Sequence, residues 1–91
     1  MGEATKQFQI VNELGLHARA ATKLVQLAAR HRSEVFLEKD GQSANAKSVM
    51  GVLLLCGARG TYVTVTAKGD DADECVQKIG ELIANKFGEE R

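Results

Sequence analysis

Residues 15–30 read GLHARAATKLVQLAAR, a glycine turn that leads directly into an amphipathic helix. Four apolar residues recur at the i, i+3, i+4 and i+7 spacing that lines one face of a helix. They are Ala21, Leu24, Val25 and Ala28. The pattern predicts a helix over residues 18–30, with His17 at its beginning and Arg19 in its first turn.

Backbone N–H groups in the first turn of a helix lack intrahelical partners and carry the positive end of the helix dipole, so they favour an anion. A neutral imidazole at His17 can attack phosphorus through one ring nitrogen. The N–H groups of Ala18 and Arg19, together with the Arg19 guanidinium, can bind phosphoryl oxygens. This spacing indicates a shallow phosphate site, although a capping or surface histidine without chemistry fits the same spacing.

Hydrophobic periodicity orders the remaining elements. Alternation of apolar and polar residues predicts strands, and Asp40-Gly41 favours a two-residue hairpin turn between two of them. Ser48 can cap a second, shorter helix, and Gly69 and Asp70 precede a third. The predicted strands cover residues 5–11, 34–39, 43–46 and 62–67, and the helices cover residues 18–30, 48–57 and a stretch that begins near residue 70.

The resulting order is βαββαβα, an α+β domain with a four-stranded sheet and its helices on one side. Ninety-one residues suffice for one small domain, spanning residues 1–91. Periodicity cannot choose the strand order, and a ferredoxin-like split βαβ fold fits the same linear order. Gly80 lies inside the third predicted helix, which suggests either close packing there or simple tolerance.

Composition excludes several function classes. Twelve Lys and Arg residues balance twelve Asp and Glu residues, and only one Tyr and three Phe are present, which argues against a nucleic-acid partner. The apolar run Val52–Cys56 is too short to span a bilayer, and residues 1–6 lack the apolar core of a signal peptide. We therefore expect a soluble, cytoplasmic chain without membrane contact.

The metal-ligating residue types are sparse. Cys56 and Cys75 show no metal-ligand spacing, and we expect both to be small buried hydrophobes. His31 follows the first helix beside two arginines, and we expect a solvated side chain. His17 and His31 lack further ligands, so neither a metal site nor a cofactor is expected.

Two motifs resemble one known family. Gly15-Leu16-His17-Ala18-Arg19 and the segment KSVMGV at residues 47–52 are similar to HPr, the histidine-containing phosphocarrier of the bacterial phosphoenolpyruvate-dependent phosphotransferase system. The resemblance extends from about Lys6 to about Phe87. One departure is Ala20, where the family usually has proline; alanine is a good helix former and can occupy the same place.

The resemblance implies an open-faced sandwich, with a four-stranded antiparallel sheet in the order 1-4-2-3 and three helices on one face. It also implies phosphoryl transfer through Nδ1 of His17, from enzyme I to sugar-specific IIA components. Such a chain is a phosphohistidine carrier of the sugar-transport system rather than a stand-alone enzyme. A monomer is the default expectation for a carrier that shows one small face to several partners.

Ser48 has a second reading besides its capping role, because it matches the position that an HPr kinase/phosphorylase modifies in part of the family. The resemblance also places a partner-docking surface beside the histidine. Its candidate residues are Thr22, Lys23, Val49, Met50 and Leu53, with Met50 partly exposed and Val52 and Leu55 inside the core. An alternative function is a regulatory binding module of the same fold, controlled through Ser48 without phosphoryl flux through His17.

Overall fold

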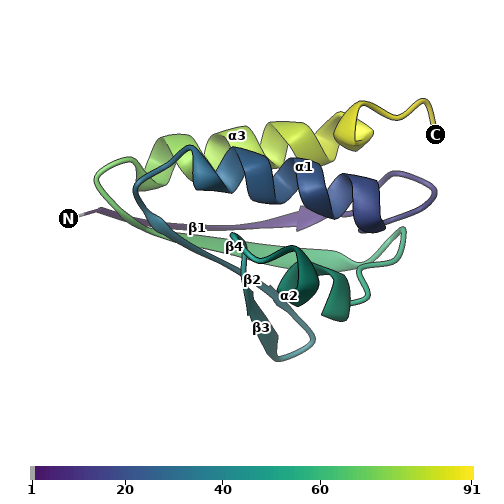
Figure 1. The fold of residues 1–91 in the computed structure, drawn as a ribbon, viewed down its shortest axis with the longest axis horizontal. Coiled ribbons are helices and arrows are strands. Elements are labelled where there is room, and N and C mark those ends of the chain that lie inside the picture. The colour runs from purple at the N-terminus through teal and green to yellow at the C-terminus, as the bar shows by residue number, and fades with distance from the viewer. Residues whose placement is uncertain (1) are drawn as a thin grey trace.

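The computed structural model describes residues 2–91 and contains four strands and three α-helices within them, in the predicted order βαββαβα (Figure 1). A short 3-10 turn, η1, follows the last helix. The elements are β1 (Gly2–Gln9), α1 (Ala18–Ala29), β2 (Glu34–Lys39), β3 (Gln42–Asn45), α2 (Val49–Leu54), β4 (Tyr62–Gly69), α3 (Ala72–Ala84) and η1 (Lys86–Gly88).

The sheet has the strand order β1-β4-β2-β3, with all neighbours antiparallel. β4 lies inside the sheet, and its side chains alternate as its sequence predicts: Val63, Val65 and Ala67 are buried, whereas Thr64 and Thr66 are partly exposed. The order is the one that the HPr resemblance implies. The open-faced sandwich is therefore confirmed.

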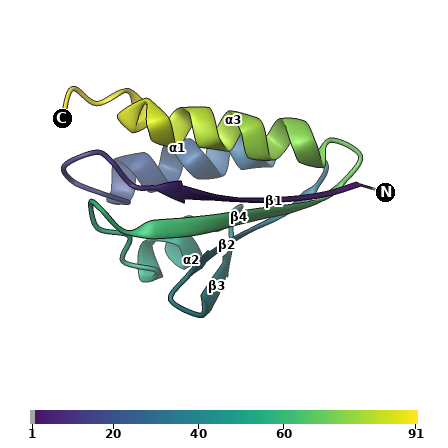
Figure 2. The same ribbon diagram turned by 180° about the vertical axis from the view of Figure 1, so that it is seen from behind.

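The helices cover one face of this sheet. α1 and α3 lie side by side above β1 and β4 in both views (Figures 1 and 2), and α3 contacts both of these strands. α2 contacts α1 and β3. Buried apolar side chains from the helices and strands form one core cluster among the described residues; its largest members are Phe87, Ile10, Leu24, Leu37, Ile79 and Ile83.

The hairpin between β2 and β3 uses the predicted two-residue turn. Lys39 pairs with Gln42, and the residues between them, Asp40 and Gly41, have φ values of 51° and 83°. Positive φ at both central residues defines a type I′ turn, whose twist matches that of the flanking strands. The dipeptide therefore set the register of this hairpin.

Gly80 is buried in α3 because the ring of Phe8 in β1 packs directly against its backbone. A Cβ atom at residue 80 would collide with the Cε1 and Cζ atoms of that ring. Close packing is therefore the reason for a glycine inside this helix. The closer contact between helix and sheet offsets the lower helix propensity of glycine.

Two side-chain expectations are wrong. Cys75 is buried, and burial raises the pKa of its thiol to about 11, but Cys56 is exposed. Cys56 follows the end of α2 with φ 53°, so the helical periodicity no longer applies to it. His31 is not solvated as expected. It is only 8% exposed, because its Nδ1 lies 3.1 Å from the Leu27 carbonyl oxygen at the end of α1.

Candidate functional site

The loop before α1 is fixed by a close backbone contact. Gly15 has φ 65°, and a Cβ atom there would collide with the carbonyl oxygen of Gly57. The next residue, Leu16, is buried and donates its N–H to that same oxygen at 2.8 Å. A non-glycine residue at 15 would push this loop away, so the glycine holds the chain where it enters α1.

His17 is the N-cap residue of α1, with an extended backbone at φ −73° and ψ 178°. Its side chain does not cap the helix and is 26% exposed. Within residues 2–91, no acceptor bonds the N–H groups of Ala18, Arg19 and Ala20, whereas the N–H of Ala21 bonds the His17 carbonyl at 2.8 Å. The imidazole therefore stands beside free donors at the positive end of the helix.

Arg19 lies in the first turn of α1 and is exposed. Its guanidinium has no hydrogen bond or ion pair within residues 2–91, so its donors remain available to an anion. Ala20, in the position where the family usually has proline, is completely buried in the core.

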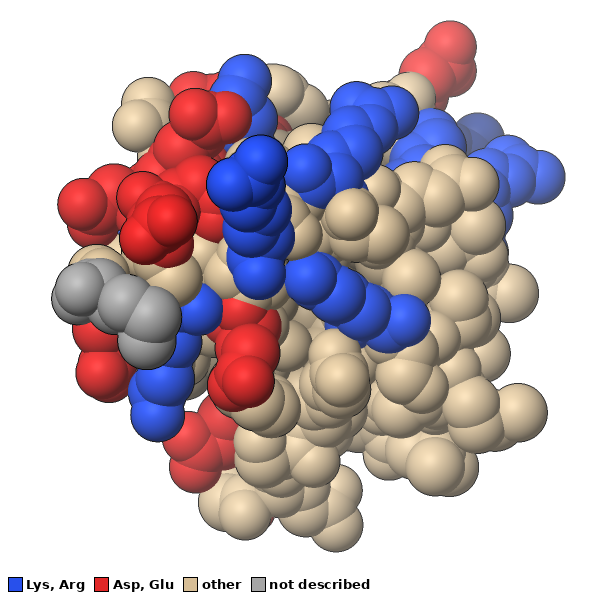
Figure 3. Space-filling view, turned by 60° about the vertical axis from the view of Figure 1, so that its left-hand side comes forward, with Lys and Arg blue, Asp and Glu red and all other residues tan. Residues whose placement is uncertain are grey.

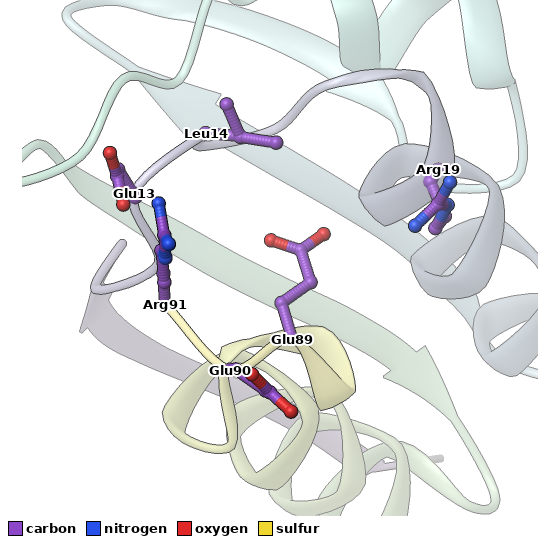
Figure 4. Close-up of a pocket in the computed structure, with 6 residues that line it drawn as sticks. All are labelled: Glu13, Leu14, Arg19, Glu89, Glu90 and Arg91. Carbon is purple, nitrogen blue, oxygen red and sulfur yellow. The ribbon is translucent and has the colours of Figure 1, made fainter.

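The side-chain carboxylate of Glu89, near the C-terminal end of the chain, lies beside His17. Glu89, which follows η1, hydrogen-bonds Nε2 of His17 through Oε2, and its Oε1 accepts a 2.8 Å hydrogen bond from Asn12. The Asn12 amide also donates to the Gly15 carbonyl at 2.9 Å, which orients it. Figure 4 shows the Glu89 carboxylate between Arg19 on α1 and the pair Glu13 and Arg91.

Two further hydrogen bonds hold the segment that carries Glu89. Lys23 of α1 donates from Nζ to the carbonyl oxygen of Phe87 at 2.6 Å, and the N–H of Glu13 donates to the carbonyl oxygen of Arg91 at 2.9 Å. Phe87 is itself fully buried. The chain on both sides of Glu89 is therefore attached to the loop and helix that present His17.

The charge state of Glu89 follows from its neighbours. Burial raises the pKa of this carboxyl group, but hydrogen bonds from His17 and Asn12, the charge that His17 carries when protonated, and the charge of Lys23 together lower it below its ordinary value. Glu89 is therefore a carboxylate at neutral pH.

The candidate regulatory and docking residues lie on or beside α2 and α1. Ser48 caps α2, Met50 is 66% exposed, and Val52 and Leu55 are buried, as predicted. Val49 and Leu53 are partly buried and pack on the core. α1 and α2 are in contact, so these residues lie on two neighbouring helices.

Two of the candidate docking residues are engaged within the chain. The Thr22 hydroxyl donates to the Ala18 carbonyl at 2.8 Å, and the Lys23 ammonium bonds Phe87 as described above. Sequence reasoning missed Glu89 and Asn12, and also the exposed apolar side chains of Leu14 and Leu54. No local pattern marks Glu89, because 72 positions separate it from His17.

Neither the surface charge in Figure 3 nor the metal-ligating side chains of residues 2–91 mark a second site. On the face shown in Figure 3, acidic and basic side chains lie side by side over one part of the surface, and the remainder is uncharged. Across residues 2–91, no group of three or more His, Cys, Asp or Glu side chains is placed to bind a metal ion. None of the helices in this part of the chain is long and apolar enough to cross a bilayer.

Comparison with known proteins agrees with this geometry. The family described as "PTS HPr component phosphorylation site" matches residues 4–85. The phosphocarrier protein HPr of Cupriavidus necator is 46% identical over 80 residues, covering 88% of this chain and 90% of that protein. The phosphocarrier protein NPr of Shewanella violacea is 42% identical over 89 residues and covers 98% of each chain.

Solved structures give the same result. HPr-C-His from Thermoanaerobacter tengcongensis superposes with a TM-score of 0.89 at 43% identity, and the match covers 100% of both chains. An HPr dimer from the same organism matches with a TM-score of 0.77 at 43% identity, covering 98% of this chain and 100% of that one. This chain belongs to the HPr family of phosphocarriers of the phosphotransferase system.

Proposed function

We propose that this chain accepts a phosphoryl group on Nδ1 of His17 from phosphorylated enzyme I and passes it to a IIA component. The observation that carries the proposal is the placement of His17: a partly exposed imidazole at the N-cap of α1, beside N–H groups of Ala18 and Arg19 that have no acceptor within residues 2–91. Membership of the HPr family supports the same assignment.

The transfer step requires little of the carrier itself. The Nδ1 lone pair forms a bond to phosphorus, the bond from phosphorus to the donor atom breaks, and its electron pair stays on the donor. The phosphoryl oxygens then lie where the free N–H groups of α1 and the Arg19 guanidinium can donate to them. These groups are exposed, so the phosphoryl group remains accessible to the next acceptor.

Ser48 is the proposed site of regulatory phosphorylation by an HPr kinase/phosphorylase, because it begins α2 beside the exposed Met50. We propose a single domain that works in the cytoplasm as a monomer. The dimeric HPr of T. tengcongensis makes the oligomeric state a quantity to measure, by sedimentation at the concentrations used for transfer.

A reconstituted relay tests this function. Labelled phosphoenolpyruvate, enzyme I, this protein and a IIA acceptor are combined, and label on the acceptor is followed with time. We expect transfer with the wild type and with His31→Ala, the matched control, and none with His17→Ala. Transfer through His17→Ala would refute the assignment, and a wild type that accepts no label would favour a regulatory module without phosphoryl flux.

A further inference from the structure

The contact between Glu89 and His17 has a chemical consequence for the imidazole. A neutral histidine carries one ring proton, and the nitrogen that bears it is set by the hydrogen bond that nitrogen makes. Glu89 is a carboxylate and can only accept, and it faces Nε2. The proton of neutral His17 therefore belongs on Nε2, which leaves the lone pair on Nδ1.

We propose that Glu89 is the positioning residue of this phosphocarrier: it holds His17 in the Nε2–H form and so makes Nδ1 the nucleophile. The inference rests on the proposed function, since it concerns the same imidazole. It adds a residue from outside residues 4–85, the part of the chain that matches the family.

The surrounding contacts make this arrangement specific. Asn12 donates to the second oxygen of the Glu89 carboxylate at 2.8 Å, so both oxygens of that group are engaged. Lys23 and Glu13 attach the chain on either side of it, at Phe87 and Arg91. The Glu89 side chain is only 14% exposed, which restricts its freedom to leave the imidazole. A carboxylate held in this way orients the ring before a donor arrives.

Glu89 also acts on the charge that develops during transfer. When Nδ1 bonds phosphorus while Nε2 keeps its proton, the ring becomes positively charged, and an adjacent carboxylate stabilises that charge. The same carboxylate repels the phosphoryl oxygens, which are held by the N–H groups of α1 and by Arg19. Attraction dominates, because the carboxylate bonds the ring directly, whereas the phosphoryl group is on the other ring nitrogen.

The first test is spectroscopic and needs no phosphoryl donor. The ring nitrogens of His17 are labelled with ¹⁵N, and their chemical shifts are measured at a pH where the imidazole is neutral. We expect wild type to show a protonated Nε2 and an unprotonated Nδ1, Glu89→Gln to retain this pattern through its amide oxygen, and Glu89→Ala to move the two shifts toward each other. Wild-type shifts in Glu89→Ala would overturn the inference.

The second test is kinetic. Single-turnover transfer from phosphorylated enzyme I should slow by roughly tenfold in Glu89→Ala, the worth of one charge-assisted hydrogen bond at a partly exposed site, and by less in Glu89→Gln. Glu90→Ala, a change at the neighbouring exposed carboxylate, should transfer at the wild-type rate. Faster or unchanged transfer in Glu89→Ala would show that repulsion of the donor outweighs positioning. Loss of transfer in the wild type itself would instead refute the proposed function and leave the spectroscopic result standing.

Discussion

The hydroxyl oxygen of Ser48 accepts a hydrogen bond from the N–H of Gly51 at 3.1 Å and thereby caps the first turn of α2. This bond uses one lone pair of a side chain that is itself partly exposed. A phosphate on the same oxygen would add about −1.5 to −2 charges at the positive end of a helix, where they are tolerated. The same charges would stand beside the exposed apolar surface of Met50, which is where we expect the partner to dock.

Ser48→Asp should therefore weaken docking and leave the fold unchanged. We expect the concentration of carrier needed for half-maximal transfer from enzyme I to rise by roughly two- to fivefold, the range of one exposed charge contact. Ser48→Ala should keep the wild-type value while losing about 1 kcal/mol of stability with the cap.

Steady-state transfer assays measure this effect. Ser43→Asp adds the same charge on β3 and serves as the control, because Ser43 lies outside the proposed docking surface. Equal half-saturating concentrations for wild type and Ser48→Asp would leave Ser48 with its capping role alone.

Arg19→Ala should slow transfer by roughly tenfold in both directions, because it removes a charged donor from the phosphoryl group. Its stability should change by less than about 0.5 kcal/mol, since the side chain is exposed. Rapid-quench transfer and urea unfolding give the two quantities, with Arg30→Ala at the other end of α1 as control. Unaltered rates would mean that the backbone N–H groups suffice.

Asp71 predicts a specific pH dependence of stability. The Ser33 hydroxyl and the Arg32 N–H donate to its carboxylate at 2.5 and 2.9 Å and, against the effect of burial, lower its pKa from 3.8 to about 2. A pKa below that of the unfolded chain means that this carboxylate stabilises the fold above about pH 4. Its contribution is lost as the pH falls from about 4 to about 2.

Urea unfolding at a series of pH values checks this expectation. Asp71→Asn should lower stability at neutral pH and flatten the decline between about pH 4 and pH 2, because the titrating group is gone. Asp70→Asn, a change at the exposed neighbour, should keep the wild-type slope. An equally steep decline in Asp71→Asn would assign the acid sensitivity to other carboxyl groups.

Gly80→Ala should destabilise the protein by about 1–2 kcal/mol, although alanine favours helices, because the added Cβ displaces the Phe8 ring. In a Phe8→Ala background the clash is absent, and the same substitution should become stabilising. A double-mutant cycle of unfolding free energies measures the change of sign. A stabilising effect in both backgrounds would show that the ring moves without cost.

Much of this fold follows from local pattern. The alternation over Tyr62–Ala67 and the Asp40-Gly41 dipeptide both specify their own neighbourhoods, and both predictions are confirmed. Strand order depends on contacts between distant segments, so only the resemblance to HPr supplied it. Helical periodicity predicts a buried Cys56, but α2 ends before it and the side chain is exposed. The place of His31 after the first helix predicts a solvated side chain, but the residue is only 8% exposed and its Nδ1 lies against the Leu27 carbonyl oxygen.

Only the part of the site that is local in sequence could be predicted. His17 and Arg19 lie two residues apart at a helix start, so their proximity follows from the sequence alone. Glu89 lies beside His17 in a segment where Phe87 is buried and Lys23 bonds the Phe87 carbonyl oxygen, and both of these contacts depend on the complete fold. A carboxylate that is placed by tertiary structure leaves no periodic signal.

We propose that Nδ1 of His17 carries the phosphoryl group. The most direct measurement is ³¹P and ¹⁵N NMR of the protein labelled with ¹⁵N-histidine, after incubation with phosphoenolpyruvate and enzyme I. We predict a coupling between phosphorus and one ring nitrogen, assigned to Nδ1 of His17, in a linkage that is labile in acid and stable in alkali. A phosphoryl group on Nε2, on His31 or on a serine oxygen would show that Nδ1 of His17 is not the acceptor.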